Sequence, residues 1–308
     1  MLESPHPLLF MESMMSSNVE TLTQINLDDL ISSFGWQNRP FLARLLRQTF
    51  SSPPQTFAHQ MVEFDSAIST RGLVEASRCA IRNYVDDLRL FGRDRIPDSG
   101  FLALSNHPGM TDTLSLFVAL NRADLKIIAL DRPFLNALPN MSKQLAYVRD
   151  DASSRIRMIR HLSIHLRNGG AALTFPAAHI EPDPDVRSGS VESLASWIDS
   201  GGVFIRMAPE AAVLPVLVRG VVQKKAANHP LTYLKRARPE REKLAAAIQL
   251  LAHVMFRKKD VHVRVQIGNP IYARDLGTTD IRVIHRAVLA EMKGLIEHPP
   301  TGEGERLL

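Results

Sequence analysis

The chain has 308 residues, of which 45% are hydrophobic and 22% are charged. This composition is typical of a globular protein with one or two domains and excludes a disordered chain. The single cysteine, Cys79, excludes an internal disulfide and a zinc site built from several cysteines, and it suits a reducing compartment. We expect Cys79 to be a small buried side chain.

Neither a membrane-spanning segment nor a targeting segment is expected. No uncharged apolar run approaches the roughly 18–20 residues that a helix needs to span a bilayer. Glu3 and Glu12 come early, and the first residues lack the basic leader and apolar core of a signal peptide. We therefore expect a cytoplasmic protein that can lie on the inner face of a membrane.

The net charge of +5 is concentrated in one segment. Residues 219–260 contain eleven Lys and Arg against three acidic residues, a local balance of +8, so the rest of the chain carries −3. This asymmetry predicts an anionic partner, such as an acidic lipid surface, an acidic protein or a cofactor, although a solvated basic face would look the same. We expect no nucleic acid, because only Tyr233 and Phe256 are available there to stack on bases.

The N-terminal part is expected to be mostly helical. Residues 1–20 show no periodicity and are predicted to be loose, whereas apolar residues at helical spacing predict a helix over 22–34. Residues 39–50 predict a short basic amphipathic helix, which either packs on the main domain or lies on a membrane surface. Further helices are predicted over 56–69 and 72–91.

From residue 101 onward, apolar strands alternate with helical segments. The predicted strands are 101–105, 126–131, 145–149, 171–175, 213–219 and 261–267, and the predicted helices are 111–121, 153–168, 191–200, 240–257 and 279–296. This alternation predicts an α/β fold with a mostly parallel mixed sheet flanked by helices, preceded by an N-terminal helical segment. We divide the chain into that segment (1–70), an α/β domain (71–298) and a flexible tail (299–308).

The turn between the first predicted strand of this domain and its helix contains a histidine and an aspartate. His107 would lie at the carboxyl end of a strand, where ligands bind in open α/β sheets. Asp112, at the helix start, could accept a hydrogen bond from one imidazole nitrogen and leave the other as a general base, with Gly109 permitting the backbone bend. The structural alternative is that Asp112 caps the helix and His107 is an ordinary loop histidine.

Two other patterns are better explained by structure than by chemistry. His161 and His165 lie one helical turn apart, but no third ligand is evident, so we predict exposed helix histidines and no metal site. Trp197 is predicted to be a core residue or to line a groove. No glycine loop of the phosphate-binding kinds is present.

The turn and three later segments together resemble a known family. Residues 106–112, with the sequence Asn-His-Pro-Gly-Met-Thr-Asp, resemble the first block of the glycerolipid acyltransferase superfamily, the family of bacterial 1-acyl-glycerol-3-phosphate acyltransferases with a His-x-x-x-x-Asp signature. Residues 145–149 resemble its second block, 173–176 the start of its third, and 213–216 its fourth. The resemblance extends over residues 92–220.

The resemblance implies a mechanism that agrees with the local interpretation of the turn. His107, oriented by Asp112, would take the proton from an acceptor hydroxyl as its oxygen attacks an acyl thioester. Backbone amides near Thr111 could help to hold an anion at the helix start. Arg149, at the end of the second block, would hold an acceptor phosphate, and Pro215 in the fourth block would lie beside the acyl site.

Arg149 also has a structural alternative, which is a surface ion pair with Asp150 or Asp151. Its neighbours Arg155 and Arg157 are predicted to be solvated helix charges.

The third block departs from the family pattern. The family continues Phe-Pro-Glu-Gly-Thr-Arg, and its Glu and Arg help to hold a glycerol-phosphate acceptor, whereas this chain has Ala177 and Ile180 at those positions. His179 and Glu181, one or two residues away, either replace them or are structural. The departure concerns the acceptor and not the His–Asp pair. The candidate substrate-binding residues are Asn106, Gly109, Thr111, Arg149, Phe175, Pro176, His179, Glu181 and Pro215.

The sequence thus predicts an O-acyltransferase of phospholipid biosynthesis. It would move a fatty acyl group from acyl-CoA or an acyl-carrier protein to a hydroxyl of a lysophospholipid or glycerol-phosphate-type acceptor, with no cofactor beyond the thioester. Residues 39–50 and 219–260 are predicted to contact an anionic membrane surface. Two alternatives stay open: a non-enzymatic lipid-surface binding protein with a degenerate fold, and a lipid hydrolase using the same His–Asp pair on water or through a serine such as Ser105. The chain has no Gly-x-Ser-x-Gly elbow.

Overall fold

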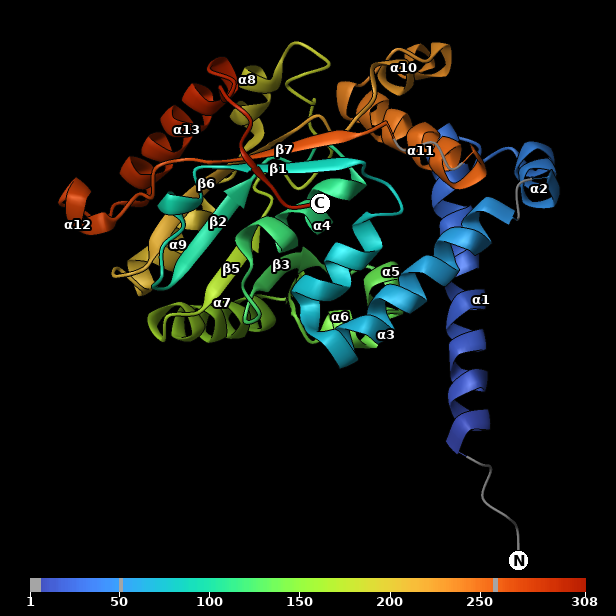
Figure 1. Cartoon of the computed structure of the whole chain (residues 1–308), viewed down its shortest axis with the longest axis horizontal. Helices are drawn as coiled ribbons and strands as arrows, with labels where there is room; N and C mark the ends of the chain where they lie inside the picture. Colours follow the sequence, from blue (N-terminus) through green and yellow to red (C-terminus); the bar gives the residue numbers. More distant parts are fainter. Residues whose placement is uncertain (1–6, 50–51, 257–259) are drawn as a thin grey trace, which may run out of the picture.

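An eight-stranded mixed β-sheet forms the centre of the molecule (Figure 1). The computed structural model describes residues 7–49, 52–256 and 260–308. The strands are β1 (Asp87–Phe91), β2 (Phe101–Ser105), β3 (Lys126–Leu130), β4 (Leu145–Val148), β5 (Ala171–Thr174), β6 (Ala212–Arg219), β7 (His262–Ile267) and β8 (Glu305–Arg306). Their order across the sheet is β4-β3-β5-β2-β6-β7-β1-β8.

The predicted α/β class with a mostly parallel mixed sheet is confirmed. Strands β4, β3, β5, β2 and β6 run parallel to one another. Strand β7 is antiparallel to β6, and β1 is parallel to β7. The six strands predicted from the sequence all form, with ends that differ by at most one residue.

Helices cover both faces of the sheet and continue into an N-terminal segment. The longer helices are α1 (Pro7–Phe34), α2 (Pro40–Thr49), α3 (Ser52–Ile81), α4 (Met110–Leu120), α7 (Ala152–Arg167), α9 (Ser200–Met207), α11 (Arg238–Phe256) and α13 (Ile281–Glu297). The short ones are α5 (Pro133–Asn136), α6 (Pro139–Ser142), α8 (Ser190–Ser193), α10 (Lys224–Ala227), α12 (Ala273–Leu276), η1 (Arg93–Arg95), η2 (Leu194–Ser196) and η3 (Pro230–Leu234). No helix within the described part of the chain is long and apolar enough to cross a bilayer.

Strand β2 lies between two hydrophobic layers, which is why all five of its residues are buried. Phe101 and Ala103 point to the face covered by α3 and α4, whereas Leu102 and Leu104 point to the face covered by α7, α9 and α13. Side chains alternate between the two faces of a strand, so a strand covered on both faces is apolar throughout. The carboxyl end of this rigid central strand carries the loop with His107.

The N-terminal helices share the core of the α/β domain. Val19 and Leu22 of α1 and Phe57 of α3 belong to the same buried cluster as the sheet face under α4. The predicted boundary at residue 70 falls within α3, which changes direction near Gly72, where φ is 78°. In Figure 1, the first half of α1 extends beyond the rest of the molecule.

The expectation that residues 1–20 are loose is wrong for residues 7–20, which belong to α1, and residues 1–6 lie outside the described residues. Helix α2 forms as predicted for residues 39–50, with Phe50 outside the described residues. The helix expected over 56–69 is part of the longer α3. The spacing of apolar residues did not predict the full length of α1 and α3. These helices pack against each other, and such tertiary packing stabilises a helix whose own sequence has little helical periodicity.

Two other predicted helices are wrong in part. The helix expected over 72–91 ends at Ile81, and residues 87–91 form β1, which pairs with β7. The buried residues of β1, Leu88 and Leu90, fit a strand as well as a helix, so only the distant partner strand decides between them. The helix expected over 191–200 is replaced by α8 and η2, and the backbone becomes extended at Trp197 (φ −69°, ψ 125°).

Two expectations about single segments are also wrong. The tail 299–308 is not loose at its end, because β8 pairs with β1, and the Leu307 amide donates to the Leu88 carbonyl at 2.8 Å. Leu307 and Leu308 pack against the main core. Cys79 was expected to be buried, but it is exposed on α3. Its Sγ lies 3.7 Å from Oε1 of Glu75.

Candidate active site

The loop after β2 brings His107 and Asp112 into contact. Asp112 is the third residue of α4 and is fully buried, and its Oδ2 lies 2.8 Å from Nδ1 of His107. The same carboxylate accepts hydrogen bonds from the amides of Gly109 (2.9 Å) and Thr113 (2.5 Å). These bonds fix the carboxylate at the helix N-terminus, where the helix dipole also favours negative charge.

The geometry leaves the second imidazole nitrogen of His107 as a base. Since a carboxylate only accepts, Nδ1 carries the hydrogen of this pair and Nε2 has the lone pair. No group among residues 7–49, 52–256 and 260–308 hydrogen-bonds Nε2, and the side chain is 27% exposed. The ring stacks on Phe175, which directly follows β5, with 4.5 Å between ring centroids.

Charges beside His107 raise its pKa. Burial alone would lower the pKa of this imidazole, but the Asp112 carboxylate raises it through its charge and its hydrogen bond, and the charge of Glu181 raises it further. The net direction is upward from 6.5. The site therefore stabilises the imidazolium form, which is the form that a general base reaches after accepting a proton.

Glu181 is buried beneath this loop, which agrees with the structural alternative for this residue and not with a contact to an acceptor. Its amide donates to the His107 carbonyl at 2.8 Å, and its Oε2 accepts from the His107 amide at 3.1 Å. Its Oε1 lies 2.8 Å from Nε1 of Trp197 and 3.0 Å from Oγ of Ser193. Burial raises the pKa of Glu181, and these donors offset that rise only in part.

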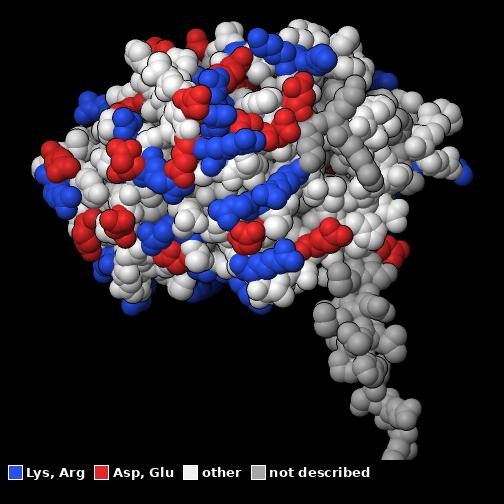
Figure 2. Space-filling model, viewed as in Figure 1, with Lys and Arg blue, Asp and Glu red and all other residues white. Residues whose placement is uncertain are grey.

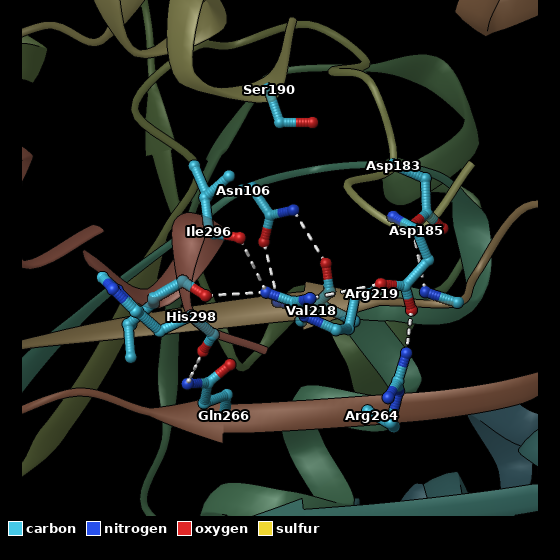
Figure 3. A network of polar contacts seen from close by, with 12 residues as sticks. Asn106, Asp183, Asp185, Ser190, Val218, Arg219, Arg264, Gln266, Ile296 and His298 are labelled. Atoms are coloured by element: carbon cyan, nitrogen blue, oxygen red, sulfur yellow. Dashed lines mark hydrogen bonds and ion pairs between the residues drawn. The ribbon is translucent and has the colours of Figure 1, made fainter. Parts of the chain in front are cut away.

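The candidate Asn106 has a structural position. Its side-chain amide donates to the Val218 carbonyl and accepts from the Val218 amide, both at 2.8 Å, which extends the β2–β6 ladder (Figure 3). In the same view, Asp185 lies between Arg219 and Arg264 and pairs with both. Arg219 is therefore a buried structural residue and not part of a basic surface, although the sequence placed it in the basic segment.

The start of α4 packs closely against the loop after β6. Gly109 has extended backbone (φ 174°), so it does not supply the expected bend, but a Cβ there would lie 3.0 Å from Cγ1 of Val221. Thr111 is buried, and its hydroxyl has no partner among the described residues. Together with His253, these residues line a cavity of about 20 Å³, enough for about one water molecule and too small for an acyl chain.

Two other predicted site residues lie after β4 and within β6. Arg149 follows β4, the edge strand, which β3 and β5 separate from β2. Its side chain is exposed and pairs with Asp131 at 3.0 Å, instead of with Asp150 or Asp151. Pro215 is buried within β6 opposite Leu104 of β2, at a point where the β6–β7 ladder is interrupted.

The third sequence block, which differs from the family pattern after Pro176, forms a tight turn beside His107. Ala178, at the position where the resembled family has glycine, adopts a left-handed conformation (φ 55°), and its amide donates to the Phe175 carbonyl at 3.0 Å. Pro176 is buried and accepts a hydrogen bond from the Ile198 amide. His179 is half-buried, and its positive form would lower the pKa of Glu181.

Ser193 and Trp197 belong to the site through Glu181, and sequence reasoning did not assign them this role. Trp197 is buried, in agreement with the prediction that it is a core residue. Its indole N–H donates to the Glu181 carboxylate, which lies 16 residues earlier in the chain. No pattern of residue spacing in the sequence predicts such a contact. Elsewhere, His165 contacts the Ala171 carbonyl and His161 is exposed, and the described residues contain no cluster that could hold a metal ion.

Replacing Asp112 tests the electrostatic account of His107. In Asp112→Asn, burial remains while the charge of the carboxylate is lost, so we expect the pKa of His107 to fall. Titration of ¹³C-labelled histidine by NMR measures this directly. Asp98→Asn, which neutralises an exposed carboxylate, should leave the titration unchanged. An unaltered His107 titration in Asp112→Asn would contradict the assignment.

The strained turn makes a prediction about stability. Ala178→Gly should raise the free energy of unfolding by about 0.5–1 kcal/mol, because a left-handed conformation costs an L-residue about 1–2 kcal/mol and glycine's extra chain entropy offsets about half. Urea denaturation measures the change. The matched control is Ala177→Gly, which has no positive φ to relieve and should lower stability; equal effects of both substitutions would refute the account.

No protein-family model matches this chain, and no curated protein matches it. Among solved structures, the chain is similar to the 1-acyl-sn-glycerophosphate (LPA) acyltransferase PlsC from Thermotoga maritima, with 15% sequence identity and a TM-score of 0.42. The similarity covers 90% of this chain and 99% of that one. At this distance, the assignment of a function depends on the sequence blocks and on the geometry of the site itself.

Proposed function

We propose that this chain is an O-acyltransferase, which moves a fatty acyl group from an acyl thioester to a hydroxyl of a lysophospholipid or glycerol-phosphate-type lipid. The observation that carries the proposal is the contact of His107 Nδ1 with Asp112 Oδ2 at 2.8 Å, which leaves Nε2 as a base at the carboxyl end of β2. The ordered sequence blocks that follow support the choice of acyl transfer over other base-catalysed reactions.

The proposed reaction needs only groups that the chain and its two substrates supply. Nε2 of His107 takes the proton of the acceptor hydroxyl, while the acceptor oxygen forms a bond to the thioester carbon. Asp112 stabilises the imidazolium, and the N-terminus of α4 favours the negative charge that develops on the carbonyl oxygen. The carbon–sulfur bond then breaks, and the departing thiolate takes the proton from His107, so the products are an ester and a thiol.

The acceptor contacts differ from those expected from the family. Glu181 is buried, and Arg149 would have to leave Asp131 before it could bind a phosphate. His179 is half-buried, lies on the same loop as Phe175 and makes no hydrogen bond to another described residue, so we propose it as the acceptor contact of the third block. Its imidazole could bind a phosphate or a hydroxyl.

Contact with an anionic membrane surface is the second part of the proposal. Leu46 of α2 belongs to a buried cluster with Leu30 of α1, and Leu251 of α11 packs against the same cluster, so the two segments that the sequence selected, 39–50 and 219–260, both contribute to it. Exposed apolar side chains lie on α2, on η3 and at the end of α11: Phe41, Leu45, Leu231, Tyr233, Leu234, Met255 and Phe256. We call this set the apolar surface.

Basic residues lie beside the apolar surface. Arg39 and Arg44 are exposed on or next to α2, and the exposed Arg236 lies two residues after η3. In Figure 2, acidic and basic side chains are interspersed over the sheet domain, whereas the end around α2 is mostly uncharged with a few basic side chains. Arg257, Lys258 and Lys259 lie outside the described residues. Apolar side chains next to basic ones favour an anionic lipid surface.

The catalytic part is tested with the pure protein, labelled acyl-CoA or acyl-carrier protein, and a panel of lysolipids. We expect an acylated lipid and a stoichiometric thiol, both identified by mass spectrometry, and a loss of rate of about 10²–10⁴-fold in His107→Gln. His161→Gln, on an exposed helix, is the matched control. Release of free fatty acid without acylated lipid would favour the hydrolase instead, and retained transfer in His107→Gln would refute the mechanism.

The membrane part is tested by sedimentation with phosphatidylglycerol-containing vesicles. Phe41→Asp combined with Leu234→Asp should weaken binding by at least about tenfold, because each buried apolar side chain contributes about 1.5–3 kcal/mol. High salt should weaken binding as well, since it screens the basic residues. Ile156→Asp, a similarly exposed residue on α7, is the control and should have no effect. Equal binding by all three proteins would contradict the proposal, whereas salt-sensitive binding without any turnover would indicate a lipid-binding protein.

A further inference from the structure

We propose that Glu181 is a positioning residue for His107: its buried carboxylate holds the backbone of the catalytic histidine and places a fixed negative charge beside the imidazole. The inference deepens the proposed function and rests on it, because it assigns a role in the proton transfer by His107. It replaces the expectation that Glu181 contacts the acceptor, since the residue is only 1% exposed.

Two hydrogen bonds join Glu181 and His107 in opposite directions. The Glu181 amide donates to the His107 carbonyl, and the His107 amide donates to Oε2 of Glu181. The residue on which the chemistry depends is thus held on both backbone groups by one residue of the loop after β5. The Asp112 contact fixes the ring of His107, and the Glu181 contacts fix the chain from which the ring projects.

The surroundings of the Glu181 side chain favour a carboxylate specifically. Oε2 faces the His107 amide, and Oε1 faces the indole N–H of Trp197 and the hydroxyl of Ser193. The Ser193 hydroxyl also lies 2.7 Å from the Ser190 carbonyl, so its one hydrogen is shared between two acceptors. A glutamine at position 181 would turn an N–H group toward one of these donors and could not satisfy them all.

Elements on the other side of the site hold the carboxylate in place. Ser193 is the last residue of α8, and the buried Trp197 directly follows η2. Trp197 belongs to the hydrophobic cluster on the face of the sheet that α9 and α13 cover, so Oε1 is bound to a well-packed segment. The charged groups that act on His107 are Asp112 and Glu181, and the charged group that acts on Glu181 is His179. Glu181 thereby links the third sequence block, which departs from its family, to the first block, which does not.

The test compares Glu181→Gln with Glu192→Gln, an exposed glutamate one residue before Ser193. In Glu181→Gln we expect kcat to fall on the order of 10–100-fold, because small misplacements of a catalytic group have costs of that size. KM for both substrates should stay within about twofold, since no substrate contact is lost. The pKa of His107, measured by NMR on ¹³C-labelled histidine, should fall because a negative charge beside the ring is removed. Glu192→Gln should match the wild type in all three.

Two results would overturn the positioning role. A raised KM for the acceptor with an unchanged kcat would make Glu181 a substrate contact. A folded Glu181→Gln protein in which the His107 titration is unchanged would make Glu181 a merely structural residue. The titration needs no substrate, so it decides the role of Glu181 even if no acceptor supports turnover, and lack of turnover in the wild type would count only against the proposed acyl transfer.

A second variant keeps the inference testable if Glu181→Gln does not fold. Trp197→Phe retains the carboxylate and its bond to the His107 amide but removes one donor, which should raise the pKa of Glu181 and disfavour its negative charge. We expect the pKa of His107 to move downward, by less than in Glu181→Gln. An unchanged His107 titration in Trp197→Phe would contradict the proposed link.

Discussion

Three buried carboxylates hold together the loops at the carboxyl edge of the sheet. Asp112 binds the amides of its own loop after β2, and Glu181, after β5, binds the His107 amide. Asp183 accepts from the amides of Gly220 and Val222 after β6, each at 3.0 Å. A buried carboxylate is stable only when hydrogen-bond donors surround it, so each of these side chains ties its loop to a defined neighbour.

This arrangement explains why the site lies where it does. Strands β5, β2 and β6 are parallel neighbours in the sheet, so the loops after their carboxyl ends lie side by side. In open α/β sheets, ligands bind at the carboxyl ends of the strands. The three carboxylates are buried among these loops, whereas the His107 side chain is 27% exposed and no described residue hydrogen-bonds its Nε2.

The electrostatics of the site favour the protonated form of His107, the proposed general base. Two carboxylates lie near His107, and both raise its pKa against the effect of burial. Such a site stabilises the imidazolium that results from proton abstraction and makes the neutral base harder to populate at low pH. In the proposed reaction, Asp112 orients the imidazole ring of His107 and contributes negative charge. Glu181 also contributes negative charge, and it holds the backbone of His107 in place.

The sequence by itself determined the sheet class, the six main strands and the loop with His107 and Asp112. These features are local: apolar runs of strand length, and a pair of residues five positions apart at a helix start, need no distant partner to be recognised. Strand β1 and the end of the chain at β8 were mistaken for a helix and a loose tail, because only pairing with distant strands makes them strands. The burial and the hydrogen-bond partners of Glu181 and Trp197, and the ion pair of Arg149, were likewise decided by tertiary structure alone. Burial and the direction of a hydrogen bond depend on which loops meet in space, and no spacing along the chain contains that information.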